Sequence, residues 1–266
     1  MTIITSIILG VVEGLTEFLP ISSTGHLILT ADLLKLETTE FLKSFEIIIQ
    51  LGAIGSVVVL YWRQFLLKRE VLKRVLLAFI PTAIIGLLFY KIIKTYLLGN
   101  LWVVVISLFV GGLILIAFEL WLSEKEKSQQ LRGEASKLES LEKISYRQAV
   151  IIGLCQSLAI VPGVSRSAAT IVGGLALGLK RETIVEFSFL LAVPTMLAAT
   201  VLDLAKSSPN FSSDEFGLLL IGFIVSFLVA LLAIKTFLAY IRNNNFIAFG
   251  IYRIIVAIVF VVVFLF

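Results

Sequence analysis

Residues 13–26 read EGLTEFLPISSTGH and place charged and hydroxyl groups within an otherwise apolar part of the chain. Glu13 and Glu17 are spaced i, i+4, so they lie on one face of a helix about 6 Å apart. Pro20 ends that helix, and the residues SST that follow are a strong N-cap signal for a second short helix. The stretch also contains His26, the only histidine of the protein. It therefore predicts a helix, a break and a second helix.

The composition of the whole chain indicates an integral membrane protein. Of its 266 residues, 59% are hydrophobic and 15% are charged, and the mean hydropathy is +1.06, whereas soluble domains carry about 25% charged residues. Several apolar runs approach or exceed the roughly 20 residues that a helix needs to cross a bilayer. These runs are 45–62, 75–94, 102–122, 184–203, 217–236 and 246–265. We therefore expect an all-α integral membrane protein with six transmembrane helices.

The two halves of the chain carry a sparse internal repeat. An offset of 142 residues aligns Pro20 with Pro162, Ser23 with Ser165 and Phe45 with Phe187. After a one-residue slip, Gly10 aligns with Gly153 and Glu13 with Gln156. Membrane folds are often built from two such halves in opposite orientations. We therefore expect two inverted repeats, 1–122 and 148–266, each a re-entrant helix pair followed by three crossings, joined by the polar linker 123–147.

The distribution of basic residues fits opposite orientations of the two halves. Most of the 22 Lys and Arg residues lie in four segments: 63–74, 123–147, 180–183 and 235–245. The positive-inside rule assigns these segments to the cytoplasm, so both termini are expected outside. The net charge of +4 is then explained by topology, and no nucleic-acid partner is expected.

The second half repeats the helix break in PGVSRSAAT, residues 162–170. Pro162 and Gly163 interrupt one helix, and Ser165 or Ser167 caps the next. Irregular backbone at membrane depth is tolerated where it is buried in protein or lines a cavity. Two opposed breaks would bring two helix N-termini together near the middle of the membrane. Their free N–H groups and positive dipole ends favour a phosphate.

The side chains near the two breaks fit chemistry on a phosphate ester or anhydride. Hydroxyl groups donate hydrogen bonds to phosphate oxygens, and a guanidinium such as that of Arg166 grips them in a fork. Two glutamates beside a diphosphate would repel it, so either a divalent cation lies between them or one is protonated. His26 suits proton transfer near neutral pH.

Each of these residues also has a structural interpretation. Intramembrane carboxylates often pair with a basic residue, and a histidine can be a hydrogen-bonded packing residue. Gly25, Ser167 and Ala168 allow close helix approach, and Arg253 in the last crossing is interpreted as a structural partner in preference to a phosphate ligand. The presence of both breaks in one chain favours the catalytic interpretation.

At these residues the sequence resembles the bacterial undecaprenyl-diphosphate phosphatase family of the bacitracin-resistance type. The glutamate-rich motif of that family matches EGLTE followed by FLPISSTGH, and its motif P-G-x-S-R-S-x-x-T is met in full by PGVSRSAAT. The resemblance covers essentially the whole chain. It implies removal of the terminal phosphate of undecaprenyl diphosphate, which leaves the carrier lipid for cell-wall synthesis and gives bacitracin resistance.

The resemblance also implies the site, the cofactor and the location. The expected catalytic residues are Glu13, Glu17, His26, Ser23 and Arg166; the substrate phosphate is expected on Ser22, Ser165, Arg166, Ser167 and Thr170; and a divalent cation, Mg²⁺ or Ca²⁺, on Glu13 and Glu17. The substrate is a polyprenyl diphosphate lipid in the bacterial cytoplasmic (inner) membrane, and the active site opens outward. A homodimer is left open. Gln156 and Ala168 replace glutamate and histidine in the second half, so one asymmetric site is expected.

Two mechanisms and a competing function stay open at this point. Either water or Ser23 attacks the terminal phosphorus, and His26 either deprotonates the nucleophile or protonates the leaving group. Inverted repeats with broken helices are also the pattern of alternating-access carriers. The alternative function is therefore a transporter or flippase for a lipid phosphate or another anion.

Overall fold

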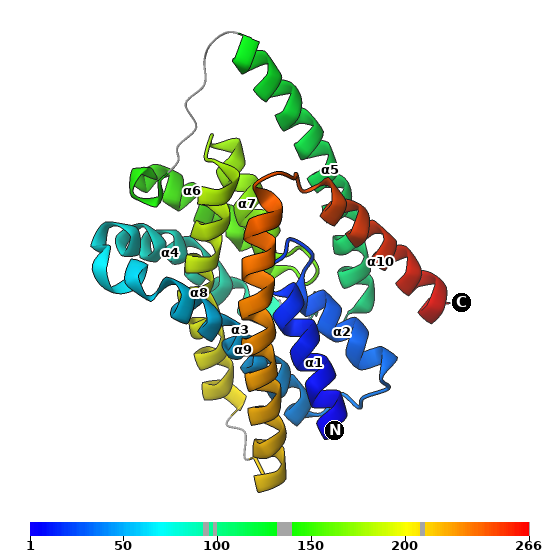
Figure 1. Cartoon of the computed structure of the whole chain (residues 1–266). Helices are drawn as coiled ribbons and strands as arrows, with labels where there is room; N and C mark the ends of the chain where they lie inside the picture. Colours follow the sequence, from blue (N-terminus) through cyan, green and yellow to red (C-terminus); the bar gives the residue numbers. More distant parts are fainter. Residues whose placement is uncertain (93–95, 98–99, 132–139, 208–210, 266) are drawn as a thin grey trace.

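The computed structural model describes residues 1–92, 96–97, 100–131, 140–207 and 211–265, and within these ranges it is helical without a β-strand. The helices of the described residues are α1 (Ile3–Thr16), α2 (Ser23–Leu33), α3 (Glu40–Leu67), α4 (Arg69–Ile92), α5 (Leu101–Leu131), α6 (Tyr146–Ser157), α7 (Arg166–Ala176), α8 (Arg181–Ser207), α9 (Ser213–Ile241) and α10 (Ile247–Leu265). Figure 1 shows their arrangement. The all-α fold class predicted from the sequence is confirmed.

Among the described residues, five helices are long and apolar enough to cross a membrane: α3, α4, α5, α8 and α9. They correspond to five of the six crossings expected from the sequence. The sixth expected crossing forms α10, of which the stretch Ile247–Val263 is apolar but shorter than 18 residues. The protein is therefore a multi-pass membrane protein.

Both predicted helix breaks are present. α1 ends at Thr16 and α2 begins at Ser23, and the two helices pack against each other. In the second half, the short 3₁₀ segment Leu158–Ile160 extends α6, and α7 follows the break and packs against α6. Each half of the chain therefore begins with a helix, a break and a second helix.

The two halves also pair with each other in a reciprocal way. α1 packs against α9, and α6 packs against α4. A glycine makes each contact close: a Cβ at Gly10 would lie 2.8 Å from the carbonyl oxygen of Gly222, and one at Gly153 would overlap the carbonyl oxygen of Ala78. α3 packs against α8, and the long α5 packs against α10 at the edge of the bundle in Figure 1.

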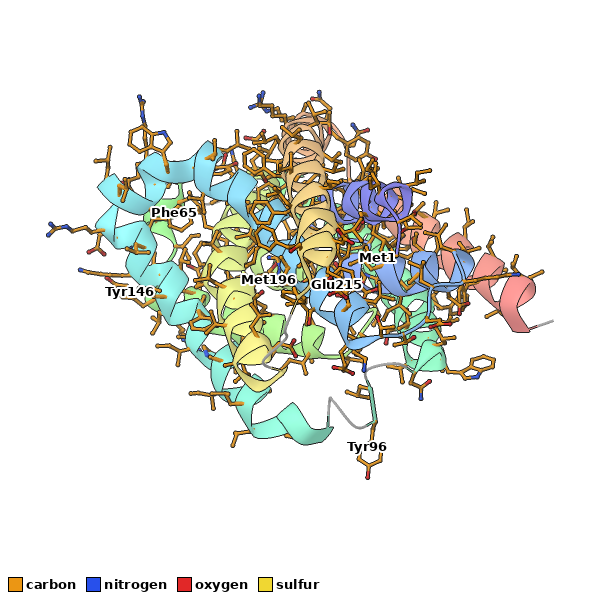
Figure 2. All side chains as sticks on the ribbon, turned by 90° about the horizontal axis from the view of Figure 1, so that it is seen from below. Met1, Phe65, Tyr96, Tyr146, Met196 and Glu215 are labelled. Carbon is orange, nitrogen blue, oxygen red and sulfur yellow. The ribbon has the colours of Figure 1, made fainter. Side chains whose placement is uncertain are left out.

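The four basic segments lie at the same end of the bundle. Ion pairs join Lys68 with Glu142 (2.9 Å), Arg181 with Glu126 (3.8 Å) and Arg242 with Glu182 (3.5 Å). At the opposite end, the amino terminus acts electrostatically on Glu215, and Figure 2 shows Met1 and Glu215 in the same region when the molecule is seen from that end. The basic segments and the amino terminus therefore occupy different ends of the molecule.

The largest apolar cluster reaches the first helix break. Phe18 is fully buried in it, and its ring meets that of Phe189 in α8 edge-on, with centroids 5.1 Å apart. Because Phe18 follows Glu17 directly, this packing holds the end of α1 beside α8. The core thereby fixes where the polar residues of the break lie.

Candidate active site

The two breaks end in serines with the same unusual backbone. Ser22 and Ser165 have φ of 73° and 75°, and each side chain accepts a hydrogen bond from the N–H three residues later. Ser165, and not Ser167, is therefore the cap of α7. The two caps are 143 residues apart, so the alignment of Ser23 with Ser165 was wrong by one residue. The reason is that the second break has one more residue between its proline and its cap serine, with Gly163 at φ 92° directly after the proline.

The corrected alignment makes Ser23 and Arg166 equivalent, as the first residues of α2 and α7. Both bind the same carboxylate. The Ser23 hydroxyl donates to Oε2 of Glu17 at 2.5 Å, and Nη2 of Arg166 donates to Oε1 at 3.2 Å. Glu17 and Ser23 are buried, with 5% and 7% of their surfaces exposed. The structure thus brings both helix breaks together on Glu17.

Arg166 is also held by α8. Its Nη1 donates to the carbonyl oxygen of Ser188 at 2.8 Å, and the Ser188 hydroxyl lies 2.7 Å from that of Thr170. The Nε of Arg166 is buried without a hydrogen-bond partner among the described residues. Sequence reasoning missed Ser188. The repeat offered a signal. It aligns Phe187 with Phe45, and therefore aligns Ser188 with Glu46, a charged residue within an expected crossing.

The hydroxyl groups of Ser167 and Thr170, which were expected to bind phosphate, make hydrogen bonds to other groups of the protein. Ser167 donates to the carbonyl oxygen of Leu19 at 2.7 Å and lies 3.1 Å from the Ser165 hydroxyl. The single hydroxyl proton of Thr170 is shared between the carbonyl oxygens of Arg166 and Ser167, each at 3.0 Å. These bonds tie α7 to the first break.

Glu13 is the least satisfied group of the site. It lies one helical turn before Glu17 and has no exposed surface, and neither carboxylate oxygen has a hydrogen-bond partner among the described residues. The charges of Glu17, Glu46 and Arg166 act on it. A buried carboxylate without a partner is costly, so this donor set fits a cation or a proton. The described residues contain no group of three or more His, Cys, Asp or Glu side chains that could hold a metal ion. Substrate or water oxygens would therefore have to complete a cation's shell.

His26 joins α2 to α10. Its Nδ1 lies 2.7 Å from the carbonyl oxygen of Ser22, and its Nε2 lies 2.9 Å from the hydroxyl of Tyr252. The residue is 8% exposed. Tyr252 was not found by sequence reasoning, because no local pattern marks a partner 226 residues away.

Arg253 holds the two breaks together. Its five N–H groups donate to five backbone carbonyl oxygens at 2.9–3.4 Å, and these belong to Pro20, Gly163, Val164, Ser107 and Leu108. The side chain has no exposed surface. Since a guanidinium has five donors, none is left for a phosphate. The structural role predicted for Arg253 is therefore confirmed.

The second half has a neutral polar cluster where the first half has Glu13. Nε2 of Gln156 donates to the hydroxyls of Thr82 (2.8 Å) and Thr195 (3.1 Å). This cluster lacks carboxylates. Of the two equivalent positions, Glu13 and Gln156, only the first therefore carries a charged side chain.

Comparison with known proteins shows the family of the chain. The family described as Bacitracin resistance protein BacA matches residues 6–259. Undecaprenyl-diphosphatase of Aquifex aeolicus is 49% identical over 266 residues, which is 100% of both chains. Proteins of the same name from Sulfurihydrogenibium sp. and Persephonella marina are 53% and 51% identical over 260 residues, which is 98% of both chains in each case. The chain therefore belongs to the bacitracin resistance protein BacA family.

Proposed function

We propose that this protein is an integral membrane phosphatase that hydrolyses undecaprenyl diphosphate to undecaprenyl phosphate and inorganic phosphate. It recycles the carrier lipid for cell-wall synthesis and gives bacitracin resistance. The observation that carries the proposal is the convergence of Ser23 and Arg166 on the buried carboxylate of Glu17. The near full-length identity to proteins named undecaprenyl-diphosphatase supports the same activity.

The contacts of Ser23 favour it as the nucleophile over water. Its hydroxyl already donates to Glu17, so Glu17 can take the proton as Ser23 Oγ attacks the terminal phosphorus. The bond from that phosphorus to the bridging oxygen then breaks, and undecaprenyl phosphate leaves. Water next attacks the phosphoserine and loses one proton to His26 while the other stays on the inorganic phosphate; the phosphorus–Oγ bond breaks, and the proton on Glu17 returns to Ser23.

Binding of the diphosphate falls to the residues of the two breaks. The unpartnered Nε of Arg166 supplies a charged donor, and the N-termini of α2 and α7 supply backbone N–H groups. The hydroxyls of Ser22, Ser165, Ser167 and Thr170 lie at these same termini. Positioning and charge stabilisation of this kind dominate phosphoryl transfer.

A divalent cation, Mg²⁺ or Ca²⁺, is part of the proposal. The orphaned oxygens of Glu13 and the carboxylate of Glu17 would hold it, and it would neutralise charge on the phosphate oxygens when bound.

The membrane arrangement is a further part of the proposal. We propose six crossings, with α10 as the last, and two inverted repeats, 1–122 and 148–266, around the linker 123–147. The reciprocal packing of α1 on α9 and α6 on α4, and the matching caps at Ser22 and Ser165, support the repeat. The end with the basic segments lies in the cytoplasm, the termini lie outside the inner membrane, and the site opens outward.

The test is phosphate release from undecaprenyl diphosphate by the purified protein in detergent, with and without a chelator. Wild type is compared with Glu17→Gln and Arg166→Ala, with the exposed Glu37 changed to Gln as the control. Metal-dependent release that both site variants lose and the control keeps is the expected result. Rapid acid quenching followed by mass spectrometry should find phosphate on Ser23. Failure of folded wild type to release phosphate with either cation would refute the phosphatase.

The reciprocal helix packing also favours a second candidate, a transporter or flippase for a lipid phosphate or another anion. Gradient-dependent uptake into proteoliposomes without hydrolysis would support it. A homodimer stays a prediction, which light scattering of the protein in detergent can check.

A further inference from the structure

The only histidine of the chain is held at both ring nitrogens. A carbonyl oxygen only accepts hydrogen bonds, so the 2.7 Å contact with the Ser22 carbonyl requires a proton on Nδ1 of His26. The neutral ring then carries its lone pair on Nε2. The nitrogen that can accept a proton is therefore the one that faces Tyr252.

Tyr252 meets that nitrogen in two ways. Its hydroxyl lies 2.9 Å from Nε2 and donates to the lone pair, and its ring stacks on the imidazole with centroids 5.5 Å apart and planes 5° from parallel. Together with the Ser22 carbonyl, these contacts leave the His26 ring one orientation.

The position of Tyr252 is itself fixed by its neighbour in α10. Arg253 is fully buried and donates to carbonyls of both helix breaks, including those of Pro20 and Val164. This clamp sets the register of α10 against the first break, and therefore sets the height of Tyr252 beside His26. Two adjacent residues of α10 therefore contact the site: Tyr252 contacts His26, and Arg253 binds the two helix breaks.

We propose that Tyr252 is a positioning residue that orients the His26 ring and holds its basic nitrogen, Nε2. This consequence rests on the proposed phosphatase function: once the Tyr252 hydroxyl turns away from Nε2, His26 accepts the proton that water loses as it attacks the phosphoserine, and His26 is not a proton donor. The orientation of the ring by Tyr252 does not depend on that function. It can be measured on the resting protein.

The experiment uses protein labelled with ¹⁵N in the histidine ring, in detergent at neutral pH. Because the chain has one histidine, the spectrum contains only the two ring nitrogens of His26. Wild type should show a protonated Nδ1 and an unprotonated Nε2 that is shifted by a hydrogen bond. In Tyr252→Phe the ring stack remains, and the Nε2 resonance should move downfield because its donor is gone.

The kinetic arm measures phosphate release by the same samples. Tyr252→Phe should lower kcat about three- to tenfold, the size expected for one hydrogen bond, with KM changed less than about twofold. The control is Tyr240→Phe in α9, whose ring packs edge-on against Phe249. It should alter neither the spectrum nor kcat.

The outcomes separate this proposal from the proposed function. An identical Nε2 resonance in wild type and Tyr252→Phe, or a protonated Nε2 in wild type, would overturn the orientation by Tyr252. A shifted resonance with unchanged kcat would overturn its contribution to the reaction. If wild type releases no phosphate at all, the phosphatase fails, while the spectra still decide whether Tyr252 orients His26.

Discussion

At the residue scale, the site is organised by one carboxylate and one guanidinium. Glu17 receives Ser23 and Arg166, which are the first residues of two helices from different halves of the chain. The guanidinium of Arg253 donates to backbone carbonyl oxygens of both breaks. Glu17 therefore joins the first residues of α2 and α7, and Arg253 holds the backbone of the two breaks.

The first prediction concerns the fork of Arg166. Arg166→Lys keeps the charge but loses the fork that reaches both Glu17 and the Ser188 carbonyl, because a lysine ammonium is a single point of charge. We expect kcat/KM for phosphate release to fall on the order of 100-fold, as on loss of a preorganised donor. The matched change Arg242→Lys, at a residue with a 68% exposed side chain, should leave it unchanged. A loss below about threefold for Arg166→Lys would contradict the assigned role.

The second prediction concerns the clamp formed by Arg253. A lysine has three donors, so Arg253→Lys loses at least two of the five hydrogen bonds to backbone carbonyl oxygens. We expect a loss of about 2 kcal/mol or more of stability, measured as a lower midpoint of thermal unfolding in detergent. An unchanged midpoint would mean that the carbonyls find other partners and that the clamp is dispensable.

At the scale of elements, the helix breaks show what a sequence can and cannot predict. Proline followed by serines predicted both breaks, because these residues act on the backbone next to them. The extra residue between the proline and the cap serine of the second break was not accounted for, since it depends on Gly163 adopting a positive φ. Tyr252 was missed because its contact with His26 arises from tertiary packing, which leaves no local pattern. Ser188 was missed although the repeat aligns it with Glu46, because its contact with Thr170 is also made only in the folded chain.

The third prediction separates the two roles of Ser165. Ser165 is an N-cap with φ 75°, and replacing it by glycine or by alanine removes the capping hydrogen bond in both cases. Glycine accepts the positive φ, whereas alanine does not. Ser165→Gly should therefore keep its stability within about 0.5 kcal/mol, while Ser165→Ala loses about 1 kcal/mol more. If Ser165 also binds phosphate, Ser165→Gly should still raise KM. Full activity in a stable Ser165→Gly would limit the serine to capping.

At the scale of the whole molecule, the halves are held together by close helix contacts, and the fourth prediction tests one of them. A Cβ at Gly153 would overlap the carbonyl oxygen of Ala78, whereas one at Gly86 in α4 meets no atom within 4 Å. Gly153→Ala should therefore destabilise the protein by about 1–3 kcal/mol. Gly86→Ala should be neutral or stabilising, because alanine is the better helix former. Equal midpoints for the two variants in thermal unfolding would contradict the close packing of α6 on α4.

The last prediction concerns the orientation of the whole molecule in the membrane. The four basic segments are joined by ion pairs at one end of the bundle, so they must lie on one side together, and the positive-inside rule makes that side the cytoplasm. In a Cys155→Ser background, which removes the only native thiol, we place single cysteines at Thr38 and Lys127, both exposed. An impermeant maleimide should label the Thr38→Cys protein in intact spheroplasts and the Lys127→Cys protein only after permeabilisation. The reverse pattern would mean that the protein has the opposite orientation in the membrane. The diphosphate site would then open to the cytoplasm, and the enzyme would act on the lipid of the other leaflet.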